Sequence, residues 1–235
     1  PGVMTAGCAQ TLINVHRVLP GKSVLMVGSG NVGVIVAYQL MQAGADVAAI
    51  IEAAPNLGGY GVHTAKIRRA GVPFFTSTTI IKAEGKESVE RAVIANIDSR
   101  FVPIADTEKV LEVDTICIAV GLTPSIELAS LAGCKMMYVS ELGGNMPIHN
   151  EYMQTTDGSI YVAGDIAGIE EASTAMEEGR LAGIHAAWSM GYMSAKEMQS
   201  KTEQTRERLG ALRQGIYGFK RYTAKERVVQ RGMTK

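Results

Sequence analysis

The sequence has few cysteines and no net charge, and each shortage excludes a class of protein. Its three cysteines, Cys8, Cys117 and Cys134, are an odd number, lie far apart and form no C-x-x-C pair. Neither a disulfide framework nor a zinc site is therefore predicted. The 23 basic and 23 acidic residues cancel, which argues against binding of a polyanion over the whole surface.

The chain also lacks a long apolar run. No stretch approaches the ~18 residues of a transmembrane helix, and no signal peptide with a charged first segment is present. We therefore expect a soluble, cytoplasmic protein that makes no use of a membrane.

Glycine, by contrast, is abundant. The chain has 26 glycines in 235 residues, more than the usual ~7%, whereas its 7 prolines are ordinary. Tight backbone turns explain such an excess. With 46% hydrophobic residues, the chain can bury one large core or two modest ones.

Strands and helices alternate in the first third of the sequence. Short apolar runs predict strands, and amphipathic segments that end at glycine predict helices. The expected strands are 24–27, 47–51 and 72–75, and the expected helices are 32–43 and 62–70. Strands without helices then follow at 79–83, 89–97 and 110–113, which predicts an antiparallel meander. The apolar run 114–120 is typical of a buried parallel strand.

The second half is less regular. We expect a domain boundary near 123–126, a last strand at 159–163, and helices at 170–190 and 195–212. The segment 201–235 carries ten basic and three acidic residues, which predicts a basic appendage. Its end, 216–222, mixes aromatic and basic residues without a nucleic-acid-binding module. We expect it to pack on a partner subunit.

A glycine motif, G-x-G-x-x-G, follows the strand expected at 24–27 and begins the helix expected at 32–43. It comprises Gly28, Ser29, Gly30, Asn31, Val32 and Gly33. The first glycine permits a tight turn, the second lets the backbone approach a pyrophosphate, and the third lets helix and strand pack closely. The phosphates would lie on the N–H groups of the helix N-terminus.

Glu52 ends the next strand, 19 residues after Gly33. An acid at this distance is expected to bind the ribose hydroxyls. A carboxylate facing the 2′-phosphate of NADP would cost several kcal/mol in order of magnitude, so NAD is favoured over NADP. Lys66, Arg68 and Arg69 on the following helix are the alternative contacts for a 2′-phosphate, although a solvated helix face explains them more simply.

Three further segments carry a resemblance. In the segment 154–165, an apolar run is followed by Gly164 and Asp165. The segment 119–124 begins with Ala119, Val120 and Gly121, and the segment 170–183 includes Ser173. Together with the glycine motif and the opening 1–7, they resemble the pyridine-nucleotide-dependent flavin oxidoreductases. The amino-acid sequence of these segments is similar to the branch of the family that contains the α subunits of sarcosine oxidase, L-proline dehydrogenase and hydrogen cyanide synthase.

The resemblance implies an α/β fold in which a Rossmann-like NAD domain with an antiparallel β-meander is inserted in an incomplete FAD-binding domain. The implied parts are a crossover segment (1–19), the NAD domain (20–125), the C-terminal part of the FAD domain (126–193) and a basic helical tail (194–235). Asp165 would contact the flavin ribityl chain, and the helix containing Ser173 would face the flavin. An N-terminal FAD fingerprint is missing, so we expect these 235 residues to retain flavin weakly or not at all.

The resulting hypothesis is hydride transfer between nicotinamide and FAD, in a homo- or hetero-oligomer that oxidises an amino acid or amine. The cofactors perform that step, so no catalytic acid, base or nucleophile is assigned. The alternative is a non-catalytic structural subunit that binds an adenine nucleotide. His16, His63, His149 and His185 share no ligand spacing and are interpreted as surface or packing residues. No metal site and no nucleic-acid partner are expected.

Overall fold

A five-stranded parallel sheet lies at the centre of the first half of the chain. The computed structural model describes residues 1–233 and divides them after Gly121 into unit 1 (Pro1–Gly121) and unit 2 (from Leu122). The strands of unit 1 run in the order β1-β8-β2-β3-β4, and every neighbouring pair is parallel. Their bounds are β1 Val3–Thr5, β2 Ser23–Val27, β3 Asp46–Ile51, β4 Phe74–Phe75 and β8 Thr115–Ile118.

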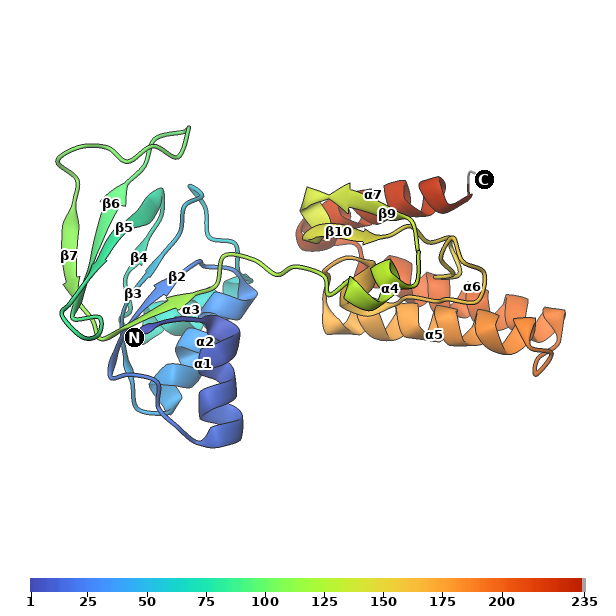
Figure 1. The fold of residues 1–235 in the computed structure, drawn as a ribbon, viewed down its shortest axis with the longest axis horizontal. Coiled ribbons are helices and arrows are strands. Elements are labelled where there is room, and N and C mark those ends of the chain that lie inside the picture. The colour runs from blue at the N-terminus through green and yellow to red at the C-terminus, as the bar shows by residue number, and fades with distance from the viewer. Residues whose placement is uncertain (234–235) are drawn as a thin grey trace. The chain divides into compact units, whose positions relative to one another are not determined.

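Helices cover one face of this sheet (Figure 1). They are α1 Ala6–Thr11, continued by the π-helical turn η1 Leu12–His16, then α2 Asn31–Gln42 and α3 Gly61–Arg69. Leu40 of α2 and Ile67 of α3 share a buried cluster with Val24 and Met26 of β2. Each of these helices therefore contributes its apolar side to one core.

A second, antiparallel sheet covers the other face. It consists of β5 Thr78–Glu84, β6 Arg91–Asn96 and β7 Lys109–Glu112. Leu25 of β2 lies in a second buried cluster with Ile94 and Val113. Because side chains alternate along a strand, β2 buries residues on both faces, as its unbroken apolar run predicts. The α/β class and the antiparallel meander are both confirmed.

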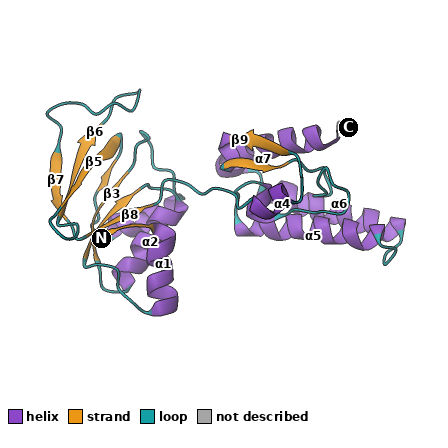
Figure 2. Ribbon diagram, viewed as in Figure 1, coloured by secondary structure: helices purple, strands orange, loops and turns teal. Residues whose placement is uncertain are grey.

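Unit 2 is mainly helical (Figure 2). Its elements are α4 Glu127–Leu131, β9 Met136–Val139, η2 Ser140–Leu142, β10 Gly144–Pro147, η3 Gly164–Ala167, α5 Ala172–Ser189, α6 Ala195–Leu212 and α7 Gly215–Met233. Strands β9 and β10 form an antiparallel pair. Leu181 of α5 packs near Leu209 of α6 in one buried cluster.

The last strand predicted, at 159–163, is wrong. This segment makes only an isolated bridge between Gln154 and Tyr161, and Val162 donates its N–H to the carbonyl of Met153 at 2.9 Å. The chain thus turns back on itself within a few residues and pairs with its own preceding segment. So tight a return leaves too few residues for a ladder.

The final segment is helical, as expected, but it is not an appendage. Ala224 and Val228 of α7 are fully buried with Leu142 and Met146. This stretch of α7 therefore completes a core within unit 2. The expected packing of 216–222 on a partner subunit stays a prediction, since Ile216 and Phe219 in this stretch are exposed.

The first residues of the chain join the parallel sheet of unit 1. Val3–Thr5 pairs with Ile116–Ile118, and Ala9 of α1 is buried in the helix-side core. The assignment of 1–19 to a flavin domain stays a prediction, as do the other domain roles.

Candidate functional site

The glycine loop begins where β2 ends, and its glycines are required by close approach of the backbone. Gly28 has φ +107°, and a Cβ there would overlap the carbonyl oxygen of Ala119 just after β8. A Cβ on Gly33 would overlap the carbonyl oxygen of Gly28. Around Gly30, in contrast, no atom lies within 4 Å of the Cβ position. The loop is therefore tightly packed on its inner side and open at Gly30.

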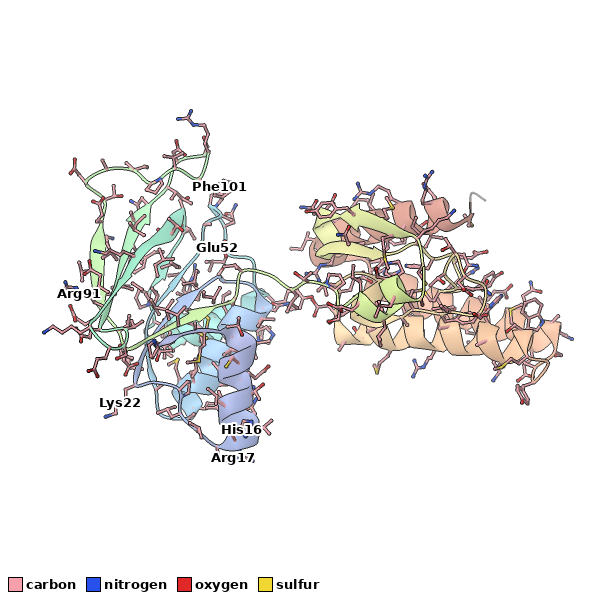
Figure 3. All side chains as sticks on the ribbon, in the orientation of Figure 1. His16, Arg17, Lys22, Glu52, Arg91 and Phe101 are labelled. Atoms are coloured by element: carbon pink, nitrogen blue, oxygen red, sulfur yellow. The ribbon has the colours of Figure 1, made fainter. Side chains whose placement is uncertain are left out.

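Glu52 lies against this loop (Figure 3). Its Oε2 accepts hydrogen bonds from the N–H of Ser29 at 2.9 Å and from the Ser29 hydroxyl at 2.7 Å, and its Oε1 accepts from the N–H of Ala54 at 2.9 Å. The carboxyl ends of β2 and β3 lie at one edge of a parallel sheet, which explains this meeting. The structure thus brings together the acid and the loop that the spacing connected.

The first turn of α2 follows the loop directly. The carbonyl of Gly30 accepts the N–H of Val34 at 3.1 Å, so the N–H groups of Asn31, Val32 and Gly33 belong to the turn that has no intrahelical acceptors. These groups and the helix dipole form an environment that favours an anion.

A segment that the sequence reasoning missed, Gly58–Gly59–Tyr60, closes on the same loop. The N–H of Gly58 donates to the Ser29 hydroxyl oxygen at 3.0 Å, and the N–H of Tyr60 donates to Asn31 Oδ1 at 2.8 Å. A Cβ on Gly59 would lie 2.8 Å from the carbonyl oxygen of Ser29. Two consecutive glycines soon after Glu52 were the available signal for this close approach.

The end of β8 contributes its backbone. Ala119 donates its N–H to the carbonyl of Val27 at 2.7 Å and abuts Gly28, so it belongs to the base of the loop. Val120 is 73% exposed, and Gly121, with φ +139°, is the last residue of unit 1.

Two of the three cations named as alternative ligands of a 2′-phosphate face aromatic rings, and the third, Arg69, is exposed. The Lys66 ammonium lies 5.4 Å from the centre of the Tyr38 ring, and the Arg68 guanidinium lies 5.6 Å from that of Phe74. Cation–π attraction of this kind explains the positions of the Lys66 and Arg68 side chains without a bound phosphate.

In unit 2, Gly164 and Asp165 open the short turn η3, and Asp165 is exposed. Gly164 has φ +74°, and its Cβ position lies 3.3 Å from the Cβ of Ala175 in the first turns of α5. Ser173 lies in the first turn of the same helix, whose N-cap is Glu171. The structure therefore places Gly164, Asp165 and Ser173 around one helix start.

A buried group of charges, missed by the sequence reasoning, lies behind this turn. Glu178 Oε1 pairs with Lys225 Nζ at 2.7 Å and with Arg213 at 2.6 Å. Burial alone would raise the pKa of the Glu178 carboxyl, but Lys225 and Arg213 outweigh it and hold that pKa below its ordinary value. Glu178 is therefore ionised at neutral pH. Nothing in its spacing distinguished Glu178 from the adjacent Glu177, which pairs with Arg180 and Arg208 instead.

Two histidines of unit 2 are packing residues, as predicted. His185 Nδ1 lies 2.8 Å from the Tyr161 hydroxyl, and its ring stacks on Tyr152. His149 is fully buried, and its Nε2 has no hydrogen-bond partner among residues 1–233. Burial lowers the pKa of His149, Lys225 and Arg213 lower it further, and Asn150 and Glu178 oppose them.

The cysteines differ from each other in environment. Burial raises the pKa of Cys117 to about 11, so this thiol is inert, as expected for a residue in the middle of a strand. Cys134 is also buried, with its thiol 3.5 Å from the Thr155 hydroxyl, whereas Cys8 is exposed.

Fold and site together define a dinucleotide-binding oxidoreductase class. A model of the pyridine nucleotide-disulphide oxidoreductase family matches residues 5–179, and the chain belongs to that family. Its members are FAD oxidoreductases that use a pyridine nucleotide, and the resemblance noted from the sequence is confirmed.

Particular relatives agree with this assignment. An opine oxidase subunit of Agrobacterium tumefaciens is 30% identical over 206 residues, 79% of this chain and 39% of that protein. The hydrogen cyanide synthase subunit HcnB of Pseudomonas aeruginosa is 26% identical over 239 residues, 95% of this chain and 51% of that protein. The crystal structure of L-proline dehydrogenase from P. horikoshii matches with a TM-score of 0.56 and 26% identity, covering 88% of this chain and 34% of that one.

The chain spans two-fifths to one half of the length of these curated relatives. Within residues 1–233, no helix is both long and apolar enough to cross a membrane. The same residues contain no group of three potential metal ligands.

Proposed function

We propose that unit 1 binds NAD(H) on the loop Gly28–Gly33 and that the protein transfers a hydride between this nicotinamide and FAD. The observation that carries the proposal is the pair of hydrogen bonds from Ser29 to Glu52, at 2.9 and 2.7 Å. They place a carboxylate beside an open glycine at a helix start, the arrangement expected for a diphosphate and its adjoining ribose.

Each residue of the loop has a separate task. Gly30 leaves room for the diphosphate, and the N–H groups of Asn31, Val32 and Gly33 donate to its oxygens. Glu52 accepts three hydrogen bonds from the protein, and a carboxylate has about four lone-pair sites. One site is therefore left for a ribose hydroxyl.

NAD is favoured over NADP by charge. The Glu52 carboxylate would repel a 2′-phosphate, and Lys66 and Arg68 already lie over aromatic rings. A 2′-phosphate would thus meet an anion and would need to draw Lys66 and Arg68 away from their rings.

Unit 2 would contribute part of a flavin site. Asp165 is exposed at the turn η3, beside the α5 helix start that contains Ser173, so its carboxylate is free to accept flavin hydroxyls. Within unit 1, Ala119, Val120 and Gly121 would contribute backbone groups to cofactor binding. The nicotinamide and the flavin carry the hydride, so these residues bind and orient.

The names of the relatives suggest a place in a larger enzyme. The opine oxidase relative and HcnB are both subunits by name, and we extend this to the present chain as part of a hetero-oligomeric amino-acid or amine oxidase or dehydrogenase of the cytoplasm. The electron-transfer step would then belong to this chain, and substrate oxidation would belong to a partner.

The test is reversal of the charge at position 52. Glu52→Arg should weaken NADH binding to the 235-residue chain by about tenfold or more, as expected for loss of charged hydrogen bonds, and should favour NADPH relative to NADH. Isothermal calorimetry measures both. Asp46→Arg, at the opposite end of β3, is the matched control and should change neither affinity.

Unchanged affinities in Glu52→Arg would remove the assignment of Glu52. Tighter binding of ATP than of NADH, with no bleaching of flavin by anaerobic NADH in the full-length protein, would favour the non-catalytic nucleotide-binding subunit.

A further inference from the structure

The turn that carries Asp165 is attached at both ends to one buried ion pair. At its start, the N–H of Gly164 donates to Glu178 Oε2 at 2.9 Å. At its end, Lys225 Nζ donates to the carbonyl oxygen of Ala167 at 2.9 Å. Glu178 and Lys225 also bond each other at 2.7 Å. The ion pair therefore closes a ring of contacts around the turn.

Two more charges complete the group. Arg213 NH2 lies 2.6 Å from Glu178 Oε1, and Arg213 Nε lies 3.1 Å from Glu170 Oε1. Glu170 Oε2 is 3.7 Å from Lys225 Nζ. All four side chains are at most 9% exposed. They come from α5, from the segment before it, from the end of α6 and from α7.

Stability alone does not account for such a group. Burying charges costs desolvation energy, and apolar side chains of similar volume are often as stable or more so. What an apolar core cannot supply is a donor for the Ala167 carbonyl and an acceptor for the Gly164 N–H. The charges therefore fix the backbone of a turn that has a single exposed carboxylate, Asp165.

We propose that Lys225 and Glu178 are positioning residues for the flavin, because they set the backbone on which Asp165 is presented. This inference rests on the proposed function, in which Asp165 contacts the flavin. It assigns α7 a part in the flavin site, exerted through the backbone of the turn.

Equilibrium binding of FAD tests the proposal in the full-length protein, including any polypeptide beyond these 235 residues. Lys225→Met should weaken FAD binding by about tenfold, the loss expected for one charged hydrogen bond, and should leave the affinity for NADH unchanged. Lys220→Met, an exposed lysine on the same helix, is the matched control and should change neither affinity. Lys225→Arg should restore part of the loss.

A double variant separates positioning from general destabilisation. If Lys225 acts through Asp165, then Lys225→Met should have little effect once Asp165→Asn is present, because residues that act through one contact are not additive. An equal loss in both backgrounds, or no loss in Lys225→Met, overturns the inference. Unchanged FAD binding in Asp165→Asn alone overturns the proposed flavin contact and the inference with it.

A measurement on the unmodified protein covers the case in which Lys225→Met does not fold. Linkage requires that a ligand which needs the ordered turn also stabilises whatever orders it. Hydrogen exchange should therefore slow on FAD binding both at Gly164 and in α7 around Lys225. Protection of the turn without protection of α7 overturns the proposal.

Discussion

Two turns in this protein present polar groups beside a helix start, and they are built by opposite means. The loop Gly28–Gly33 is shaped by absence of side chains: Gly28 and Gly33 pass so close to Ala119 and to each other that no Cβ fits on either. The turn Gly164–Ala167 is shaped by charges, since Glu178 and Lys225 bond its two ends.

The difference lies in where the determining residues are found in the chain. Gly28, Gly33 and Glu52 act within one strand–helix–strand unit, so a short stretch of sequence contains the whole arrangement. The turn around Asp165 depends on side chains 14 and 58 residues away, as far as α7. Local steric rules therefore build the first turn, and tertiary packing builds the second.

The largest effect is expected from breaking the charge group of unit 2. Arg213→Met removes one of the two cations that the buried Glu178 and Glu170 share and leaves them Lys225, and removal of one member of a buried pair costs about 3–5 kcal/mol. Trp188 is the single tryptophan and lies in unit 2, so its fluorescence during urea unfolding reports this unit. Arg206→Met, at a half-exposed pair with Glu151, should cost far less. Equal losses would mean that the buried group has no special role in stability.

A smaller loss of folding stability is expected when a Cβ is added at Gly28 in the glycine loop of unit 1. Gly44, which follows α2 and lies outside the loop, provides the control. Gly44→Ala tests a positive φ alone, because Gly44 has φ +100° and no atom within 4 Å of its Cβ position; about 1 kcal/mol is expected. Gly28→Ala adds overlap with Ala119 to a similar φ of +107°, for a total of about 3 kcal/mol.

Hydrogen exchange of β2 and β8 measures both glycine variants within unit 1. The excess loss in Gly28→Ala is the part that comes from close backbone approach. Similar losses in the two variants would show that backbone conformation alone, without close approach, requires the glycine at position 28.

The smallest effect concerns pH. His149 has a pKa lowered mainly by burial, so below about pH 6.5 the unfolded chain binds a proton that the folded chain does not. Folding stability is therefore fully present above that pH and decreases as the pH falls toward the folded pKa. Between pH 7.5 and 5.5 unit 2 should lose about 1 kcal/mol through this residue.

The matched variant is His149→Phe, which removes the titrating group and keeps an aromatic ring. Its urea midpoint, followed by Trp188, should depend less on pH than that of the unmodified protein. His185, whose pKa is also lowered by burial, adds a change of the same sign to both proteins. An identical pH dependence would show that folding does not lower the pKa of His149.

Much of the first unit was predictable from local patterns. The helix expected at 32–43 is α2 at Asn31–Gln42, and the strand expected at 47–51 is β3 at Asp46–Ile51. Their apolar periodicity and terminal glycines are local features, and the tertiary structure did not override them. In unit 2 the same reasoning correctly predicted α6 at Ala195–Leu212. It also predicted a strand at 159–163, but this apolar run pairs only with the segment just before it.

The candidate sites divide in the same way. Spacing alone connected Glu52 with Gly33, and the contact with Ser29 lies where parallel strand ends must meet. Spacing gave no indication of Gly58–Gly59–Tyr60 as a cover for the loop, nor of Lys225 as a partner of the Asp165 turn. Contacts of that kind depend on how a returning segment packs.

The sequence by itself determined the strand–helix alternation, the tight turn at Gly28 and the acid at the end of β3, because each follows from steric limits and side-chain periodicity over a few neighbouring residues. Only the tertiary structure decided that the basic end of the chain would bury Lys225 beside Glu178. Whether a charged side chain is solvated or buried depends on which distant groups meet it, and no local pattern encodes that meeting.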